Sequence, residues 1–163
     1  MTAESTAALD GNSLRGVFGC FPSGVTAICA LVDGAPSGMA ASSFTSVSLD
    51  PPLVLICVAN SSSTWPGLRG SPRLGVSILG ADQAPACQQL SARSDDRFAA
   101  LEWRATDGGA VLLNEAAAWF ECEIDDEIPA GDHVIVVLRI HDLAAVPEVE
   151  PLVFHASRYR QVV

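Results

Sequence analysis

Five of the fifteen residues in the segment 38–52 carry a hydroxyl group: Ser42, Ser43, Thr45, Ser46 and Ser48. Two strongly apolar runs, VTAICALV and PPLVLICVA, flank this segment. A buried hydroxyl must find a hydrogen-bond partner, so a packed strand pair does not need five of them at one corner. A site that holds a polar, anionic ligand at the mouth of a barrel does need them. The alternative is a serine-rich connection that caps its own turns.

Histidine and cysteine spacing does not favour a metal site. His133 and His141 lie eight residues apart on an expected strand, which places them on one face but roughly 26 Å apart. The five cysteines are odd in number and contain no C-x-x-C pair. We therefore interpret them as reduced core thiols of a cytoplasmic protein, and we expect no zinc. The sequence also has no G-x-G-x-x-G motif after a strand, and a P-loop is excluded because the chain has no lysine.

Composition indicates one folded domain with an acidic surface. The chain has 163 residues, of which 49% are hydrophobic, and a formal net charge of −10. Such a charge disfavours binding to nucleic acid or to an anionic membrane, because phosphate neutralisation needs clustered cations. The N-terminus lacks the basic and apolar regions of a signal peptide, and the longest uncharged apolar run, 51–59, is too short to span a bilayer.

The hydrophobic pattern predicts six or seven strands with a few short helices between them. We expect a flexible tail over residues 1–11 and a single domain over 12–163. Expected helices cover 14–21, capped by Asn12-Ser13, a short helix begins at 63–66, and a third, N-capped by Asp82, covers 82–92, followed by a helical turn at 95–101. Expected strands cover 25–32, 38–43, 53–59, 73–79, 117–124, 134–140 and 151–159.

This order of elements disfavours a doubly wound sheet, because long helices do not alternate with the strands. It favours a mainly β fold, a small antiparallel barrel with peripheral helices. The acidic run 125–127 reads as a solvated turn. Several strands are apolar on both faces, and a subunit interface could cover the second face.

Four sequence blocks resemble the flavin reductase family, the small FMN-binding split-barrel reductases with a Greek-key-like antiparallel barrel. The specific block is SFTSVSLDPPLV at 43–54, and PSGVT at 22–26, GM at 38–39 and GDH at 131–133 lie before and after it in the expected order. Matching features also occur at 76–79, 82–83 and 97–98, so the resemblance covers roughly residues 12–160. It implies that NADH or NADPH delivers hydride to bound FAD or FMN. It further implies a homodimer that passes reduced flavin to a separate flavin-dependent monooxygenase.

The resemblance also implies roles for particular residues. His133 would lie beside the nicotinamide as the catalytic residue. The residues implied to hold the flavin are Ser23, Gly24, Val25, Thr26, Ala41, Ser42, Ser43, Ser46, Val47, Ser48, Val58, Ala59, Asn60, Ser61, Ser77, Ile78 and Leu79. Among these, Ser46 and Ser48 would reach the phosphate side. Tyr159 would either cover the nicotinamide pocket or serve as a core tyrosine with a bonded hydroxyl.

Two positions depart from the family pattern G-M-T-x-N-S-F, because Ala40 and Ser42 remove a hydroxyl and an amide. These departures weaken the expectation of side-chain bonds to the flavin ring at these two positions, but backbone contacts there are still expected. Arg93 and Arg97 read as surface arginines, although one could hold a phosphate. A non-catalytic flavin-binding module is the alternative function, and an oxidase that keeps its flavin bound is a third.

Overall fold

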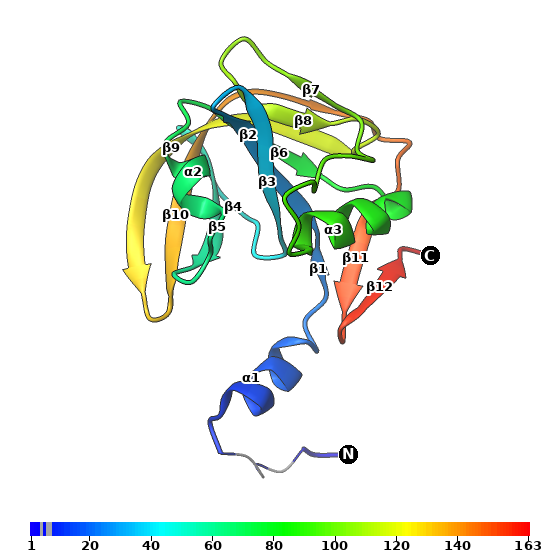
Figure 1. Cartoon of the computed structure of the whole chain (residues 1–163). Coiled ribbons are helices and arrows are strands. Elements are labelled where there is room, and N and C mark those ends of the chain that lie inside the picture. Colours follow the sequence, from blue (N-terminus) through cyan, green and yellow to red (C-terminus); the bar gives the residue numbers. More distant parts are fainter. Residues whose placement is uncertain (4, 6–7) are drawn as a thin grey trace.

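Strands dominate the computed structural model of the chain, which describes residues 1–3, 5 and 8–163. The main sheet contains β2 (Thr26–Val32), β3 (Ala35–Ala41), β4 (Thr45–Leu49), β5 (Pro52–Ala59), β6 (Leu74–Ile78), β9 (Ala118–Ala130) and β10 (His133–Ala145). These seven strands are all antiparallel to their neighbours and follow the order β3-β2-β6-β9-β10-β5-β4. The predicted fold class, mainly β with peripheral helices, is confirmed (Figure 1).

Two smaller sheets and several short helices surround the main sheet. One small sheet contains β1 (Ser23–Gly24), β11 (Leu152–His155) and β12 (Arg158–Gln161), and the other contains β7 (Trp103–Ala105) and β8 (Val111–Leu113). The helices are α1 (Gly11–Phe18), α2 (Trp65–Arg69), α3 (Ala84–Ser91) and the 3₁₀ helix η1 (Ala81–Gln83). No helix of the described residues is long and apolar enough to cross a membrane.

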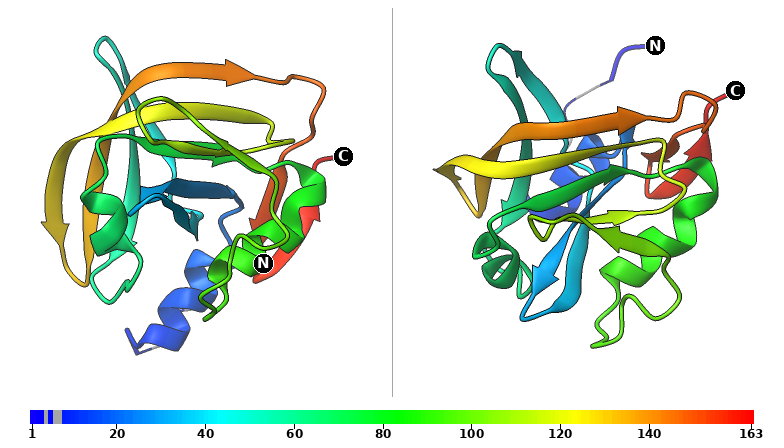
Figure 2. Two further views of the ribbon diagram at one scale, coloured as in Figure 1. Left: turned by 45° about the horizontal axis from the view of Figure 1, so that its top comes forward. Right: turned by 90° about the horizontal axis from the view of Figure 1, so that it is seen from above.

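The main sheet curves strongly (Figure 2). Its two edge strands follow each other directly in the chain. β3 and β4 form the two edges, and only residues 42–44 join them. This short connection contains Ser43 and Phe44, the first two residues of the SFTSVSL block, and Ser42, which precedes the block. The curvature therefore places this block where the two ends of the sheet come together.

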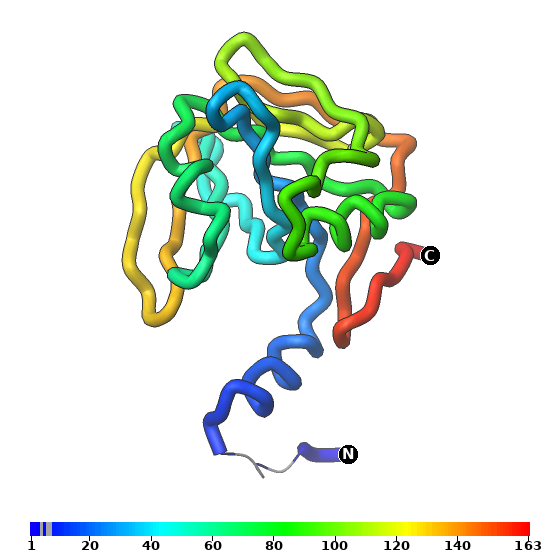
Figure 3. The backbone as a smooth tube through the Cα atoms, viewed as in Figure 1, coloured from blue at the N-terminus to red at the C-terminus, as the bar shows by residue number. Residues whose placement is uncertain are grey.

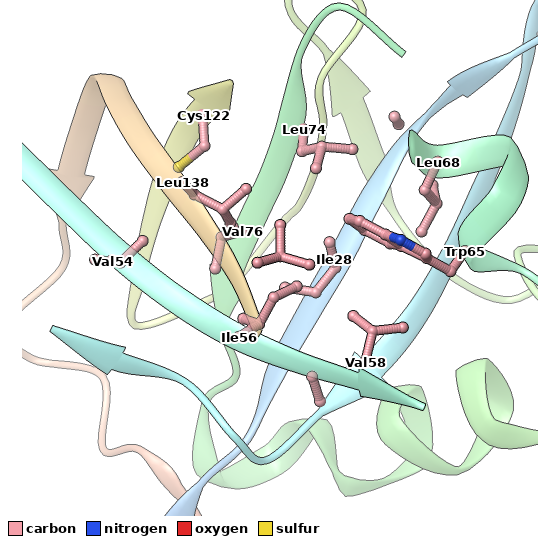
Figure 4. Packing of buried hydrophobic residues seen from close by; sticks show 13 residues of the cluster. Ile28, Val54, Ile56, Val58, Trp65, Leu68, Leu74, Val76, Cys122 and Leu138 are labelled. Atoms are coloured by element: carbon pink, nitrogen blue, oxygen red, sulfur yellow. The ribbon is translucent and has the colours of Figure 1, made fainter. Parts of the chain in front are cut away.

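The larger hydrophobic core lies within the curve of the main sheet. Its fully buried side chains include Ile28, Ile56, Leu68, Leu74 and Val76, and α2 closes one side with Trp65 (Figure 4). A second cluster packs between β2, β8 and α3 around Val111, Leu90 and Leu79. The alternating burial along β5 follows from this arrangement, because only one face of the strand points into the larger core.

Helix α1 extends away from the rest of the chain (Figures 1 and 3). It begins at Gly11 and its N-cap is Asp10, whose Oδ1 accepts a hydrogen bond from the backbone N–H of Ser13 at 2.8 Å. The predicted cap at Asn12-Ser13 is therefore wrong by two residues. No side chain of this helix is buried, and Phe18 is 67% exposed.

Several other predicted elements differ from the structure. The hydroxyl-rich segment forms a strand, β4, rather than a connection only, and the acidic run 125–127 lies within β9 because that strand continues to Ala130. The last predicted strand is a hairpin, β11–β12, since Ala156 and Ser157 adopt positive φ and reverse the chain. Asp82 lies inside η1, where Gly80 and Gln83 form the cap instead, and residues 95–101 form turns without a helix.

Candidate functional site

A polar groove lies beside β3 and has a volume of about 650 Å³. Three segments line it: Met39 and Ala40 of β3, the loop 61–64 that follows β5, and residues 90, 91, 93–95 and 97 at the end of α3 and beyond. This volume is typical of sites that bind small molecules, roughly 300–1,000 Å³. The groove therefore lies next to the GM block and directly after the strand that follows the SFTSVSL block.

The lining of the groove is suited to an anion. Six hydroxyl side chains contribute to it: Ser61, Ser62, Ser63, Thr64, Ser91 and Ser94. Two arginines, Arg93 and Arg97, line the same space, and Asp95 is the carboxylate that accompanies them. Guanidinium groups and hydroxyls together are the usual donors to phosphate oxygens.

Arg97 joins the three segments of the groove. Its Nη1 donates a hydrogen bond to the carbonyl oxygen of Gly38 at 3.2 Å and another to Oγ1 of Thr64 at 2.8 Å. These bonds connect the loop after α3 both to β3 and to the loop 61–64. Arg93 is exposed and also lines the groove. Sequence analysis left both arginines as ambiguous, because the contacts that place Arg97 span 59 and 33 residues.

The turn that carries His133 is fixed to the end of β5. The backbone N–H of Asn60 donates to the carbonyl oxygen of Asp132 at 2.9 Å, and Nδ2 of Asn60 donates to that of Gly131 at 3.4 Å. His133 itself pairs with Ala59 in the β5–β10 ladder. Since the groove loop begins one residue after Asn60, the structure brings His133 and the groove to the same end of β5.

Asp132 orients the imidazole ring of His133. Its Oδ1 lies 2.7 Å from Nδ1 of His133. The hydrogen bond and the charge of the imidazole hold the pKa of the Asp132 carboxyl below its ordinary value. With Nδ1 committed to Asp132, Nε2 is the ring nitrogen that remains for a ligand.

Comparison with known proteins identifies the family. The model of the flavin reductase like domain matches residues 18–163. The chain belongs to the flavin reductase family. A probable flavin reductase of Rhizobium meliloti is 43% identical over 141 residues, which are 86% of this chain and 44% of that protein. The chain thus spans less than half the length of this relative.

Two further relatives match nearly their whole length. The reductase subunit HsaB of a flavin-dependent monooxygenase from Rhodococcus jostii is 33% identical over 157 residues, covering 96% of this chain and 80% of the relative. The crystallised NADH:FAD oxidoreductase of Streptomyces globisporus, in complex with NAD and FAD fragments, is 38% identical with a TM-score of 0.92, covering 99% of this chain and 98% of that one. The chain is thus similar over nearly its whole length to proteins that include the reductase subunit of a flavin-dependent monooxygenase.

Several side chains that the resemblance assigned to flavin binding are buried in this member of the family. Oγ1 of Thr26 donates to the carbonyl oxygen of Ala41 at 2.9 Å, and Oγ of Ser77 accepts from the backbone N–H of Leu113 at 3.0 Å. Val25, Val58 and Leu79 belong to the two cores. These side chains stabilise the walls, and only the backbone at these positions remains as a source of ligand contacts.

Ser46, Val47 and Ser48 lie at the opposite end of β5 from the groove. Ser46 pairs with Val54 and Ser48 with Leu53, while Val47 forms a bulge between them. Because the six steps from Val54 to Asn60 cover roughly 20 Å of extended strand, these hydroxyls do not line the groove of their own chain. The sequence suggested that the five hydroxyls form one site. In the structure, strand β4 carries Ser46 and Ser48 away from Ser42 and Ser43.

The remaining residues that the resemblance assigned lie in two places. One is the small sheet of β1, β11 and β12, and the other is the ends of β3 and β6. Ser23 and Gly24 form β1, where Ser23 pairs with Phe154. Ser42 is exposed directly after β3, and Ile78 ends β6 half-buried. Tyr159 packs against Phe154 with ring centroids 5.5 Å apart. Burial and a hydrogen bond with Cys87 raise the pKa of Tyr159 to about 12.

Proposed function

We propose that this flavin reductase transfers hydride from NADH or NADPH to FAD or FMN and releases the reduced flavin to a separate flavin-dependent monooxygenase. The observation that carries this proposal is the open groove, whose hydroxyls and two arginines suit a flavin phosphate. A site on the surface permits exchange of the flavin, and hydroxyl donors hold a phosphate less tightly than a set of cations does. The reductase subunit of a monooxygenase among its relatives supports the separate partner.

The residues around the groove have distinct proposed roles. The phosphate would lie against Arg93, Arg97 and the loop 61–64, and the backbone of 41–43 and 23–24 would contact the ring. Bound flavin supplies the hydride acceptor. His133 would contact the nicotinamide through Nε2, because Asp132 holds Nδ1. A fixed histidine beside two stacked rings favours hydride transfer by orienting the reactants.

The catalytic unit is proposed to be a homodimer. Along β5, Val54, Ile56 and Val58 point into the core, so the alternating Leu53, Leu55 and Cys57 point to the other face and are half-buried. Ile135 and Val137 of β10 stand opposite Cys57 and Leu55 and extend this apolar face. A second copy would cover a face of this kind.

We favour NADH over NADPH. The formal net charge of the chain is −10, so the additional 2′-phosphate of NADPH meets an unfavourable overall field. The two groove arginines are proposed to be occupied by the flavin.

The test is the absorbance of NADH with purified protein and an excess of either FAD or FMN. We expect rapid oxidation whose rate increases with the concentration of free flavin. A His133→Asn variant should bind flavin as the wild type does but oxidise NADH more slowly. Oxidation that does not depend on added flavin would indicate an oxidase with a resident cofactor. Protein that binds flavin but oxidises neither NADH nor NADPH would be the non-catalytic binding module.

A further inference from the structure

Helix α1 carries an apolar stripe that the described part of its own chain leaves largely exposed. Leu14, Val17 and Phe18 recur at the spacing that places side chains on one face of a helix, and Phe21 follows in the next turn. Val17, Phe18 and Phe21 are 68%, 67% and 79% exposed. We call Leu14, Val17, Phe18 and Phe21 the α1 stripe.

The C-terminal end of α1 is attached to the domain, so the helix presents this stripe in a defined place. The backbone N–H of Ala156, in the turn between β11 and β12, donates to the carbonyl oxygen of Gly19 at 2.8 Å. The backbone N–H of Phe21 donates to the carbonyl oxygen of Phe18 at 3.1 Å, which keeps the exit from the helix compact. Figure 1 shows α1 leaving the domain at the end where β1 and β11 lie.

A permanent partner suits the α1 stripe better than a transient one. Aromatic side chains gathered in one exposed patch promote aggregation unless they are covered. A monooxygenase that collects reduced flavin would cover them only during an encounter. A lipid surface is disfavoured, because helices that lie on membranes are rich in Lys and Arg, whereas Arg15 is the only charged residue of α1 and the net charge of the chain is −10. A second copy of the chain would cover the stripe at all times.

The area that a stable dimer needs favours the same partner. The outer face of β5 and β10 consists of five half-buried side chains: Leu53, Leu55, Cys57, Ile135 and Val137. Five such side chains offer roughly 300 Å², whereas a stable interface covers roughly 800 Å² on each copy. Phe18 and Phe21 together expose roughly another 300 Å², at about 200 Å² for a whole aromatic side chain. With Val17 and Leu14, the α1 stripe brings the apolar surface of one copy close to the required area.

The α1 stripe is also connected directly to backbone that is proposed to contact the flavin ring. Only Pro22 separates Phe21 from Ser23, the first residue of β1. Strand β1 contains two residues and pairs only with β11, at one edge of its small sheet. Such a short strand is held weakly by its own ladder. A firm contact of the stripe on its N-terminal side would therefore fix the position of β1.

We propose that α1 of each copy packs on the second copy through the α1 stripe, and that this contact holds β1 in place for the flavin ring. The flavin site is then complete only in the dimer. This inference rests on the proposed function, since it concerns the same flavin site and the homodimer proposed there.

The test uses the full chain with Phe18→Glu or Phe21→Glu, and Gly16→Glu as the matched control. Both phenylalanine side chains are largely exposed in the single chain, so a carboxylate there should leave its fold intact. Gly16 is two residues from both Leu14 and Phe18, which places it on the opposite face of α1, and nothing lies within 4 Å of a Cβ there. Sedimentation velocity gives the oligomeric state, and quenching of flavin fluorescence gives Kd for FMN and FAD at several protein concentrations.

We expect the wild type and Gly16→Glu to sediment as dimers, and both phenylalanine variants to sediment as monomers at micromolar concentration. Kd for the flavin should rise about tenfold in these two variants. It should fall toward the wild-type value as the protein concentration is raised, because mass action restores the dimer. A local distortion of β1 would not depend on protein concentration.

Two results would overturn the proposal. Phenylalanine variants that remain dimeric would show that the α1 stripe does not pack on a second copy. Monomeric variants that bind flavin as tightly as the wild type would show that one chain completes the site. A wild type that binds flavin but oxidises neither NADH nor NADPH would contradict the proposed function alone, because sedimentation and flavin binding do not depend on turnover.

Discussion

The Oγ of Ser43 makes two hydrogen bonds to the backbone of Cys57, accepting from its N–H at 2.9 Å and donating to its carbonyl oxygen at 3.1 Å. The β4–β5 ladder ends at Thr45–Leu55, and two residues further along the same register Cys57 stands opposite Ser43. The side chain of Ser43 thus replaces a backbone partner where the edge strand stops. These bonds hold the connection between β3 and β4 against β5.

We predict that Ser43→Ala lowers the free energy of unfolding by about 1 to 2 kcal/mol, because a half-buried N–H and C=O lose their partner. Chemical denaturation measured by circular dichroism would show the change. Ser46→Ala is the matched control, since Ser46 is exposed in the same sequence block and should alter stability little. Equal effects of the two substitutions would contradict the structural role of Ser43.

The positions of the strands along the chain could be predicted from the sequence only in part. Strong apolar runs predicted β2 and β5 almost to the residue, because burial dictates their composition. β4 was missed, since its hydroxyls resemble a loop and its pairing with β5 is a tertiary property. Similarly, Asp125 to Glu127 seemed a turn, whereas β9 holds them on its exposed part through ion pairs such as Arg69–Glu127 and Arg139–Asp125.

A glycine in the centre of the sheet offers a second stability prediction. A Cβ on Gly75 would lie 2.0 Å from the carbonyl oxygen of Val111, and this backbone atom has no space to move because β6, β8 and β2 pack together there. We predict that Gly75→Ala lowers the free energy of unfolding by about 3 kcal/mol. Gly16→Ala in α1 is the control, since nothing lies within 4 Å of that position. Similar thermal unfolding of both variants would refute this close packing.

Arg93 tests the phosphate end of the groove. This arginine is exposed and makes no hydrogen bond to another side chain among the described residues, so its replacement should not disturb the fold. We predict that Arg93→Gln raises KM for FMN and FAD by about tenfold, equal to 1.4 kcal/mol, but leaves KM for riboflavin unchanged because riboflavin has no phosphate. Arg104→Gln, on strand β7 and outside the lining of the groove, should change none of these constants. A rise in KM for riboflavin would indicate a general distortion instead.

The site shows the same limit of sequence analysis as the fold. His133 and Asn60 were both assigned by resemblance, and the hydrogen bonds from Asn60 to the carbonyl oxygens of Gly131 and Asp132 explain why two blocks 71 residues apart belong together. Ser61 was also assigned by resemblance, but residues 62–64 and Arg97 were not, because a serine-rich loop and an isolated arginine are common on surfaces. Only the contact of Arg97 with Thr64 and Gly38 distinguishes them.

The pH dependence of stability is expected to reflect Glu123. Hydrogen bonds from His141 and then Arg73 lower the pKa of Glu123 from its ordinary value of 4.5. A carboxyl with a lowered folded pKa stabilises the protein above the unfolded pKa, and this contribution is lost as pH falls through the folded pKa. Glu123→Gln should therefore melt at a slightly lower temperature than the wild type at pH 7. The difference should disappear well below pH 4.5, and a constant difference at all pH values would exclude ionisation as its cause.

The outer apolar face of β5 and β10 makes the oligomeric state testable. Val137 is half-buried on that face, opposite Leu55 of β5 and Asp126 of β9. We predict that the wild type sediments as a dimer and that Val137→Glu sediments as a monomer, because a carboxylate there would be desolvated without a partner in the interface. Leu143→Glu is the control, since Leu143 lies on the same strand but is 56% exposed and outside this face. If the wild type sediments as a monomer at micromolar concentration, this face does not pair two copies. If Leu143→Glu also dissociates the dimer, the interface lies nearer the end of β10 and the assignment to the β5–β10 face is wrong.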